Sequence, residues 1–208
     1  MQRRQRFSFF LLVLIVPLLV SCVGVEANIE INANGSGIIN LKYRVSRMVE
    51  SMGKLDGNEK YLPLPVGRVD FERTVARING LSLNSFSSKL EEKDLVINAS
   101  LAFSDPSVLS AFLDASGRTA KYQSQSGTSS LSLLLAEGGG PLDVDLERLV
   151  NTVFEGYSID ITIKTPSLPS SNAVGTVAAA NRIAAFKMPV ADLLSSQKPI
   201  NWDLTWKE

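Results

Sequence analysis

Histidine is absent from the 208 residues, and cysteine occurs once, as Cys22. Without histidine the chain can form neither a Ser-His-Asp nor a Cys-His catalytic arrangement, and His-based metal sites are excluded as well. A single cysteine cannot form an intramolecular disulfide. Carboxylates, lysines and hydroxyls are the chemistry that remains. We assign no catalytic, cofactor-binding or metal-binding residue, and we expect a non-enzymatic protein that needs no cofactor.

A strongly basic segment is also missing. The 21 Lys and Arg residues balance 21 Asp and Glu residues, and no Lys/Arg-rich run is interleaved with aromatic residues. The positive surface that a nucleic-acid-binding protein needs is therefore absent. We expect no nucleic-acid partner.

Three segments resemble ligand-binding loops only in part. Residues 30–35, EINANG, begin like a calcium loop, but Leu41 stands where the bidentate glutamate belongs. Residues 143–147, DVDLE, place acids at alternate positions, but Phe154 stands where a calcium loop carries its bidentate glutamate. The acids are better explained by a helix N-terminus, which favours negative charge. Residues 137–141, EGGGP, lack the Lys-Ser/Thr pair of a phosphate-binding loop and are interpreted as a linker.

The most informative motif lies at the N-terminus. Three arginines among the first six residues precede an uncharged apolar run from Phe7 to Val20, which is the pattern of a secretory signal peptide. The run is shorter than the roughly 20 residues that a transmembrane helix needs. It also contains Pro17, which disfavours a helix interior. A permanent membrane span is the less favoured alternative.

The apolar run ends in Leu19-Val20-Ser21-Cys22, which resembles the bacterial lipobox. By that resemblance residues 1–21 are a lipoprotein signal peptide, and Cys22 becomes the first mature residue and carries a diacylglycerol thioether with palmitate-like chains. The alternative is an ordinary cleaved signal peptide followed by a free cysteine. Two or more acyl chains hold a protein stably on a bilayer, so we expect a lipid anchor to a membrane of the bacterial cell envelope. Val23 replaces the Asp that retains some enterobacterial lipoproteins in the inner membrane, which slightly favours the outer membrane.

Residues 22–208 are expected to form a single domain tethered through its N-terminal cysteine. This length is enough to bury a core and suits one domain. Removal of the signal peptide takes away three arginines and leaves 18 basic against 21 acidic residues. Attachment to the membrane is therefore expected to come from the lipid and not from a basic surface.

Alternation of polar and apolar residues with a period of two predicts several strands. An Asn-Gly turn at residues 34–37 predicts that the first two strands form a hairpin. Two further hairpins and three single strands are expected, and the predicted strands cover residues 25–33, 39–45, 81–90, 95–103, 119–125, 130–136, 157–165, 182–188 and 200–206. Loops are expected over residues 54–67 and 166–175, and short helical segments over 46–53 and 190–195.

Three amphipathic helices are expected to begin near Asp70, Asp105 and Asp145, each of which can cap free backbone N–H groups. Their apolar stripes predict that Phe71, Phe112 and Leu149 are buried against a sheet. Short connections within the β segments favour antiparallel pairing. The predicted fold is therefore α+β, with a predominantly antiparallel sheet built from hairpins and amphipathic helices mainly on one face.

The last predicted strand carries both tryptophans, Trp202 and Trp206, on one side. One interpretation is that they close the core. The alternative is an exposed aromatic stripe that meets a ligand, a partner or the bilayer interface.

Three segments together resemble the LppM-like bacterial lipoproteins. They are residues 28–46 (NIEINANGSGIINLKYRVS), 161–175 (ITIKTPSLPSSNAVG) and 200–206 (INWDLTW). The resemblance implies an envelope lipoprotein domain associated with lipid recognition, and it carries no catalytic residues over to this chain.

Two hypotheses for the function remain open at this point. The first is a binding module for a lipid or another apolar ligand, which predicts an apolar cavity of roughly 300 Å³ or more. The second is a protein-interaction or assembly module of an envelope complex, which predicts a filled core and an exposed contact surface. Alternating strands serve a cavity wall and a packed core equally well, so the strand pattern does not separate the two. We place the lipid or other apolar ligand slightly ahead, because the expected anchor holds the domain close to acyl chains.

Overall fold

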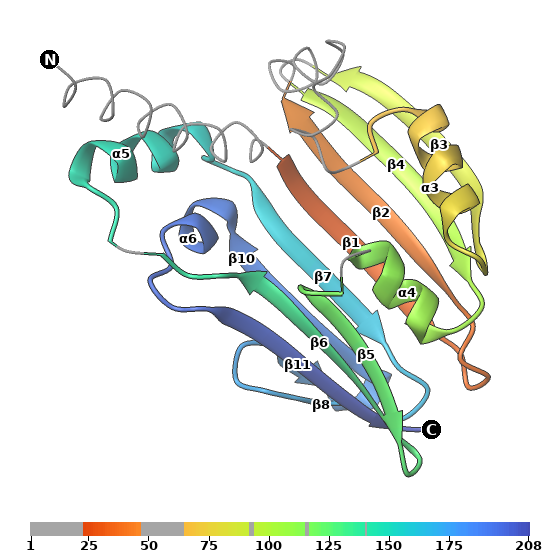
Figure 1. Ribbon diagram of the computed structural model, residues 1–208. Helices are drawn as coiled ribbons and strands as arrows, with labels where there is room; N and C mark the ends of the chain where they lie inside the picture. Colours follow the sequence, from red (N-terminus) through yellow and green to blue (C-terminus); the bar gives the residue numbers. More distant parts are fainter. Residues whose placement is uncertain (1–22, 47–64, 92–93, 115–116, 140) are drawn as a thin grey trace, which may run out of the picture.

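The computed structural model describes residues 23–46, 65–91, 94–114, 117–139 and 141–208 (Figure 1). It has two β-sheets and four short α-helices within these ranges, which confirms the predicted α+β class. The signal peptide, Cys22, the helical segment expected after Ser46 and the loop up to residue 64 lie outside the described residues.

The larger sheet has seven strands in the order β3-β4-β2-β1-β7-β10-β9. All neighbouring strands are antiparallel except β1 and β7, which run parallel. Its strands are β1 (Val23–Ile31), β2 (Gly37–Ser46), β3 (Leu81–Glu91), β4 (Asp94–Phe103), β7 (Ser158–Lys164), β9 (Thr176–Ala178) and β10 (Ile183–Pro189). The predicted predominance of antiparallel pairs is confirmed.

The smaller sheet has four strands in the order β5-β6-β11-β8. They are β5 (Ala120–Gln125), β6 (Thr128–Ala136), β8 (Ser170–Ser171) and β11 (Ile200–Lys207), and all pairs are antiparallel. The three predicted hairpins are confirmed as β1 with β2, β3 with β4, and β5 with β6. The segment expected as a loop over residues 166–175 contains the two-residue strand β8, which sequence alternation cannot reveal because it is too short.

The smaller sheet packs on one face of the larger sheet. The rings of Phe186 and Trp202, from β10 and β11, have centroids 5.9 Å apart. Trp202 is 1% exposed and Trp206 is 4% exposed, so both tryptophans close the core between the sheets. The alternative of an exposed aromatic stripe is wrong, because β11 turns its apolar side toward the larger sheet.

Helices α3 (Arg68–Arg77) and α4 (Pro106–Leu113) cover the rest of that same face. Phe71 of α3 is fully buried and lies between the rings of Tyr43 and Phe86, at centroid distances of 6.5 and 5.5 Å. Phe112 of α4 is half-buried against the core. The prediction that helices lie mainly on one face of the sheet is confirmed for these two.

Helices α5 (Val144–Val153) and α6 (Val190–Leu194) lie at the end of the sheets where β1 and β7 begin (Figure 1). They pack against each other in a small separate apolar cluster formed by Val150, Phe154, Val190 and Ala191. Leu149 is 53% exposed, so the prediction that it is buried was wrong. The apolar side of α5 is wider than the apolar surface of α6 that packs against it. Leu149 lies on the part of that apolar side that no described residue covers.

The three helices begin within two residues of the predicted aspartates, but two of the three predicted caps were wrong. Asp105 is the N-cap of α4 and accepts the N–H of Ser107 at 2.9 Å, as expected. Helix α5 is capped by Asp143, which accepts the N–H of Leu146 at 2.8 Å, and not by Asp145. Asp143 and Asp145 both precede the apolar stripe of α5. The local sequence does not show which of the two caps the helix, and the prediction of Asp145 rests only on its being nearer to the stripe.

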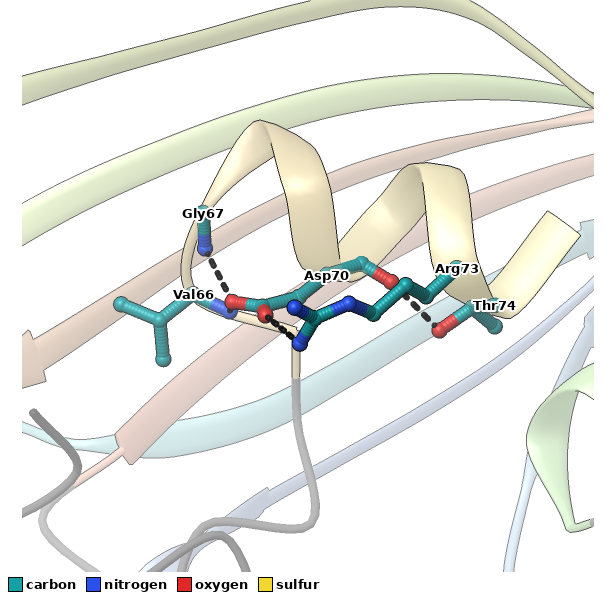
Figure 2. Close-up of polar contacts among 5 residues, drawn as sticks. All are labelled: Val66, Gly67, Asp70, Arg73 and Thr74. Atoms are coloured by element: carbon teal, nitrogen blue, oxygen red, sulfur yellow. Dashed lines mark hydrogen bonds and ion pairs between the residues drawn. The ribbon is translucent and has the colours of Figure 1, made fainter. Parts of the chain in front are cut away.

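Helix α3 begins at Arg68, earlier than predicted, with Gly67 as its N-cap. Asp70 instead stands in the first turn and reaches back to accept the N–H of Gly67 at 2.8 Å (Figure 2). Arg73 lies 3.9 Å from the same carboxylate, and the hydroxyl of Thr74 donates to the carbonyl of Asp70 at 2.8 Å. These contacts fix the first turn of α3 over the sheet.

None of the helices in the described ranges is both long and apolar enough to cross a membrane.

Candidate functional site

The face of the larger sheet that lies opposite the helices and the smaller sheet carries polar side chains. We call it the open face. Its polar members alternate along the strands with residues of the core and are exposed or half-buried: Glu26, Asn28, Glu30, Asn40, Lys42, Arg44, Ser85, Ser87, Asn98, Ser100, Asp160, Thr162, Lys164 and Lys187. The same face also carries apolar residues, among them Ile38, Val96, Ala102, Ile183 and Ala185. Among the described residues, the smaller sheet and the helices α3 and α4 all lie on the opposite side of the larger sheet (Figure 1).

Strand register arranges the uncharged polar side chains in rows across this face. Asn40 of β2 stands between Asn28 of β1 and Ser100 of β4. In the next row Asn98 of β4 stands between Lys42 and Ser87. Residues directly opposite on neighbouring strands have Cβ atoms about 4.5–5.5 Å apart, so these side chains form a continuous hydrogen-bonding surface.

A shallow hollow of about 270 Å³ lies within these rows. It is lined by Asn28, Asn40, Leu41, Lys42, Ser85, Phe86, Ser87, Asn98, Ala99 and Ser100. Serine and alanine are short, and an irregularity in the pairing of β3 between Leu83 and Ser85 shifts the outward side chains of that strand. The hollow therefore presents amide and hydroxyl groups and one ammonium group.

The cations of the open face differ in how they are paired. Lys164 lies 2.6 Å from Glu30, and Lys187 lies 2.9 Å from Asp160. The hydrogen bond and the charge of Asp160 raise the pKa of Lys187 above its ordinary value. Lys42 forms no ion pair with any of the residues that the structure describes. Glu26 stands opposite Lys42 on β1 without forming an ion pair, so the ammonium group can still bind a carboxylate that approaches the hollow.

A second hollow of about 380 Å³ is lined by Lys164, Ala180, Asn181, Arg182 and Ile183. Lys164 is half-buried and already paired with Glu30. The guanidinium of Arg182 donates to the carbonyl of Pro166. Because its cations are engaged, this hollow offers less to a ligand than the first one does.

One end of the larger sheet is held by a polar clamp across the start of β1. The hydroxyl of Tyr157 donates to Asp94 at 2.7 Å, and the guanidinium of Arg44 lies 5.1 Å from the centre of the Tyr157 ring. Arg44 also donates to the carbonyl of Gly156 at 2.7 Å. A Cβ atom on Gly24 would lie 3.3 Å from this ring, which is a tight contact, so glycine lets Tyr157 pass over β1.

Within the described part of the chain, no group of three or more acidic or cysteine side chains is placed to hold a metal ion. No protein-family model matches the chain, and no curated protein matches it. The resemblance to LppM-like lipoproteins therefore stays a prediction from the three segments that carry it. Cys22, the one site residue predicted from the sequence, lies outside the described residues.

Sequence reasoning identified part of the open face without recognising it as a site. Alternation placed Asn28 and Asn40 on the polar side of the first hairpin. It gave no reason to group them with Asn98 and Ser100, which are about 60 residues further along the chain. The order of the strands brings these side chains together, and no local pattern encodes that order.

Proposed function

We propose that the protein is a lipid-anchored, non-enzymatic module of the bacterial cell envelope that binds a protein partner through its open face. The lipobox-like segment before Cys22 supports the anchor. The observation that carries the binding function is that, among the described residues, the helices α3 and α4 and the smaller sheet all cover the side of the larger sheet opposite Asn40.

The size of the open face fits one side of a protein interface. Seven strands spaced about 4.8 Å apart make a sheet about 29 Å wide, and strands of about eight residues are about 26 Å long. The face therefore measures roughly 750 Å². In an interface of standard size each partner buries about 800 Å², which is close to this value. The open face is large enough for a specific complex without contributions from other surfaces.

The chemistry of the open face indicates what the partner presents. Amide side chains such as Asn40 and Asn98 both donate and accept hydrogen bonds, and the serine hydroxyls between them do the same. Lys42 adds a positive charge that forms no ion pair within the described residues, although Glu26 stands opposite it on β1. We therefore propose a partner surface that is polar and carries a carboxylate opposite Lys42.

An apolar ligand, the other hypothesis from the sequence, receives less support. Trp202, Leu204 and Trp206 fill the space between the two sheets. The two hollows described above are lined in large part by polar and charged side chains. We therefore place a protein partner ahead of a lipid partner.

Substitution of Asn40 by arginine tests the proposed binding face. Asn40→Arg puts a bulky charge in the middle of the hollow, while the exposed side chain leaves room for it, so folding is expected to be unchanged. Extracted from membranes in mild detergent, the wild-type chain is expected to elute as a complex larger than the monomer. The variant is expected to elute as the monomer.

Thr205→Arg is the matched control, because Thr205 is exposed on the outward side of β11 in the smaller sheet. This variant is expected to elute with the wild-type complex. A wild-type chain that elutes as a monomer contradicts the proposed function. So does a complex that Thr205→Arg dissociates and Asn40→Arg does not.

A further inference from the structure

Among the described residues, helix α5 has three exposed apolar side chains, of which Val144 stands at its first position and the other two lie one turn apart. Leu149 is 53% exposed and Val153 is 39% exposed, and residues four apart are neighbours on one side of a helix. We call these two residues the α5 patch. On the adjoining side of the same helix Val150 is buried against α6. The core therefore does not account for the apolar character of the α5 patch.

The C-terminal end of α5, which carries Val153, leads directly to the point where the described chain begins. Tyr157 follows Val153 by four residues, and its ring is the nearest neighbour of a Cβ atom built on Gly24 of β1. The N–H of Val190, the first residue of α6, donates to the carbonyl of Tyr157 at 3.0 Å. The end of α5, the start of α6 and the start of β1 therefore meet at Tyr157 (Figure 1).

The proposed acyl chains must leave the protein close to this point. Cys22 precedes Gly24 by two residues, and a chain spans at most about 3.6 Å per residue, or about 7 Å for two. The bilayer surface that receives the acyl chains is therefore held against the end of the molecule that carries α5.

We propose that the α5 patch docks on the membrane to which Cys22 is anchored, with Leu149 and Val153 inserted into the bilayer interface. This inference rests on the proposed lipid anchor. An amphipathic helix that lies in the interface buries its apolar side at the boundary between headgroups and acyl chains. Two side chains bind weakly by themselves, but the anchor makes docking intramolecular and raises the effective concentration.

The charges on α5 indicate which lipids it meets. Asp145 and Glu147 stand in its first turn, and Arg148 lies 3.3 Å from Asp145. The helix thus carries an excess of acids, unlike the basic segments that bind anionic lipids. Docking is therefore expected to occur on phosphatidylcholine, whose net charge is zero, and to resist high salt.

Docking through α5 also orients the open face. Strands β1 and β7 both start at the end where α5 lies and run away from it (Figure 1). The larger sheet then stands on the membrane by one end, so the hollow around Asn40 remains accessible from the side. A partner reaches the open face without displacing the lipid.

A fluorescent label on the α5 patch tests the inference. Cys22 is the only native cysteine and is blocked when it is acylated, so Leu149→Cys provides a unique thiol. The acylated chain is labelled there with an environment-sensitive dye and reconstituted into phosphatidylcholine vesicles that contain nitroxide-labelled lipid. We expect severalfold stronger quenching in these vesicles than in vesicles without nitroxide, at low and at high salt.

Leu168→Cys is the matched control. Leu168 is 58% exposed, close to the value for Leu149, and follows β7 at the end away from Tyr157. Its label is expected to remain unquenched. Equal quenching at the two positions, or none at position 149, overturns the docking of α5. A blue shift at position 149 that needs no vesicles and grows with protein concentration also overturns it, because a second copy then covers the patch.

Acylation of Cys22 is checked on the same samples by mass spectrometry. An acylated, vesicle-bound chain with an unquenched label at position 149 overturns only the docking of α5 and leaves the proposed anchor intact. A chain whose Cys22 is unmodified after passage through a bacterium that processes lipoproteins overturns both.

Discussion

Tyr43 combines a core position with a polar group. Its ring is 2% exposed beneath α3, and its hydroxyl donates to the carbonyl of Pro65. Burial raises the pKa of Tyr43 above its usual value of 10.0, and the negative charge of Asp70 acts in the same direction. The folded protein therefore keeps this proton at pH values at which an unfolded chain loses it.

Tyr43→Phe is expected to have an effect that depends on pH. At neutral pH the variant loses the hydrogen bond to Pro65, which costs about 1 kcal/mol of unfolding free energy. Retention of the proton contributes to stability fully below the unfolded pKa, and this contribution is lost as the pH rises above it. The wild type therefore loses stability above pH 10.0 through this group, and the variant does not.

Urea unfolding followed by circular dichroism at neutral and alkaline pH measures this effect. The difference between the two chains is expected to shrink as the pH rises above 10.0, the usual value for tyrosine. A difference that stays constant over this range contradicts the assignment of Tyr43 as a buried, neutral phenol.

At the scale of the elements, the caps decide where the helices start. Asp105 accepts the N–H groups of Ser107 and Val108 at 2.9 and 3.4 Å, and the hydroxyl of Ser107 is the largest of the causes that lower the pKa of Asp105. A lowered pKa means that this contribution to stability is present above the usual pKa of 3.8 and is lost as the pH falls through the folded value.

Asp105→Ala is expected to cost about 1 kcal/mol of unfolding free energy at neutral pH, because it leaves the first N–H groups of α4 without a cap. Asp145→Ala on α5 is the control. Asp145 has a side chain that is 92% exposed and pairs only with Arg148 among the described contacts, so its loss is expected to cost about 0.5 kcal/mol or less. Equal losses for the two variants in denaturant titrations would show that Asp105 does not act as a cap.

The elements that the sequence predicts best are those with a full local period. β1, β2 and β7 alternate over seven residues or more and appear with bounds within three residues of those predicted. β8 and β9 have two and three residues, so they show no period. Their pairing depends on the neighbouring strands β11 and β10.

Contacts between distant segments are the part that local patterns do not contain. The parallel pair of β1 and β7 joins Val25 with Ile159, and no local pattern in either strand names its partner. The same limit applies to the candidate site. The sequence shows Asn40 and Asn98 only as polar residues of two separate strands, and the order of the strands in the sheet makes them neighbours. The exposure of Leu149 was missed for a related reason: a helical stripe predicts an apolar side but not what covers it.

The whole molecule has two distinct surfaces in this account. The open face lies along one side of the larger sheet, and the α5 patch lies at the end where β1 begins. A lipid anchor at that end leaves the open face free for a partner. The docking of the α5 patch depends on the proposed covalent attachment at Cys22, two residues before Gly24, and the same attachment holds the open face near the membrane.

Intact-mass spectrometry of the chain extracted from bacterial membranes tests this attachment most directly. We predict a mature chain of residues 22–208 with a diacylglycerol thioether on Cys22, and Cys22→Ala is expected to remain unprocessed and unlabelled by a clickable fatty acid. An unmodified chain with the full mass of 22.6 kDa would contradict the account. A mature chain that begins at another residue and carries a free thiol would contradict it equally.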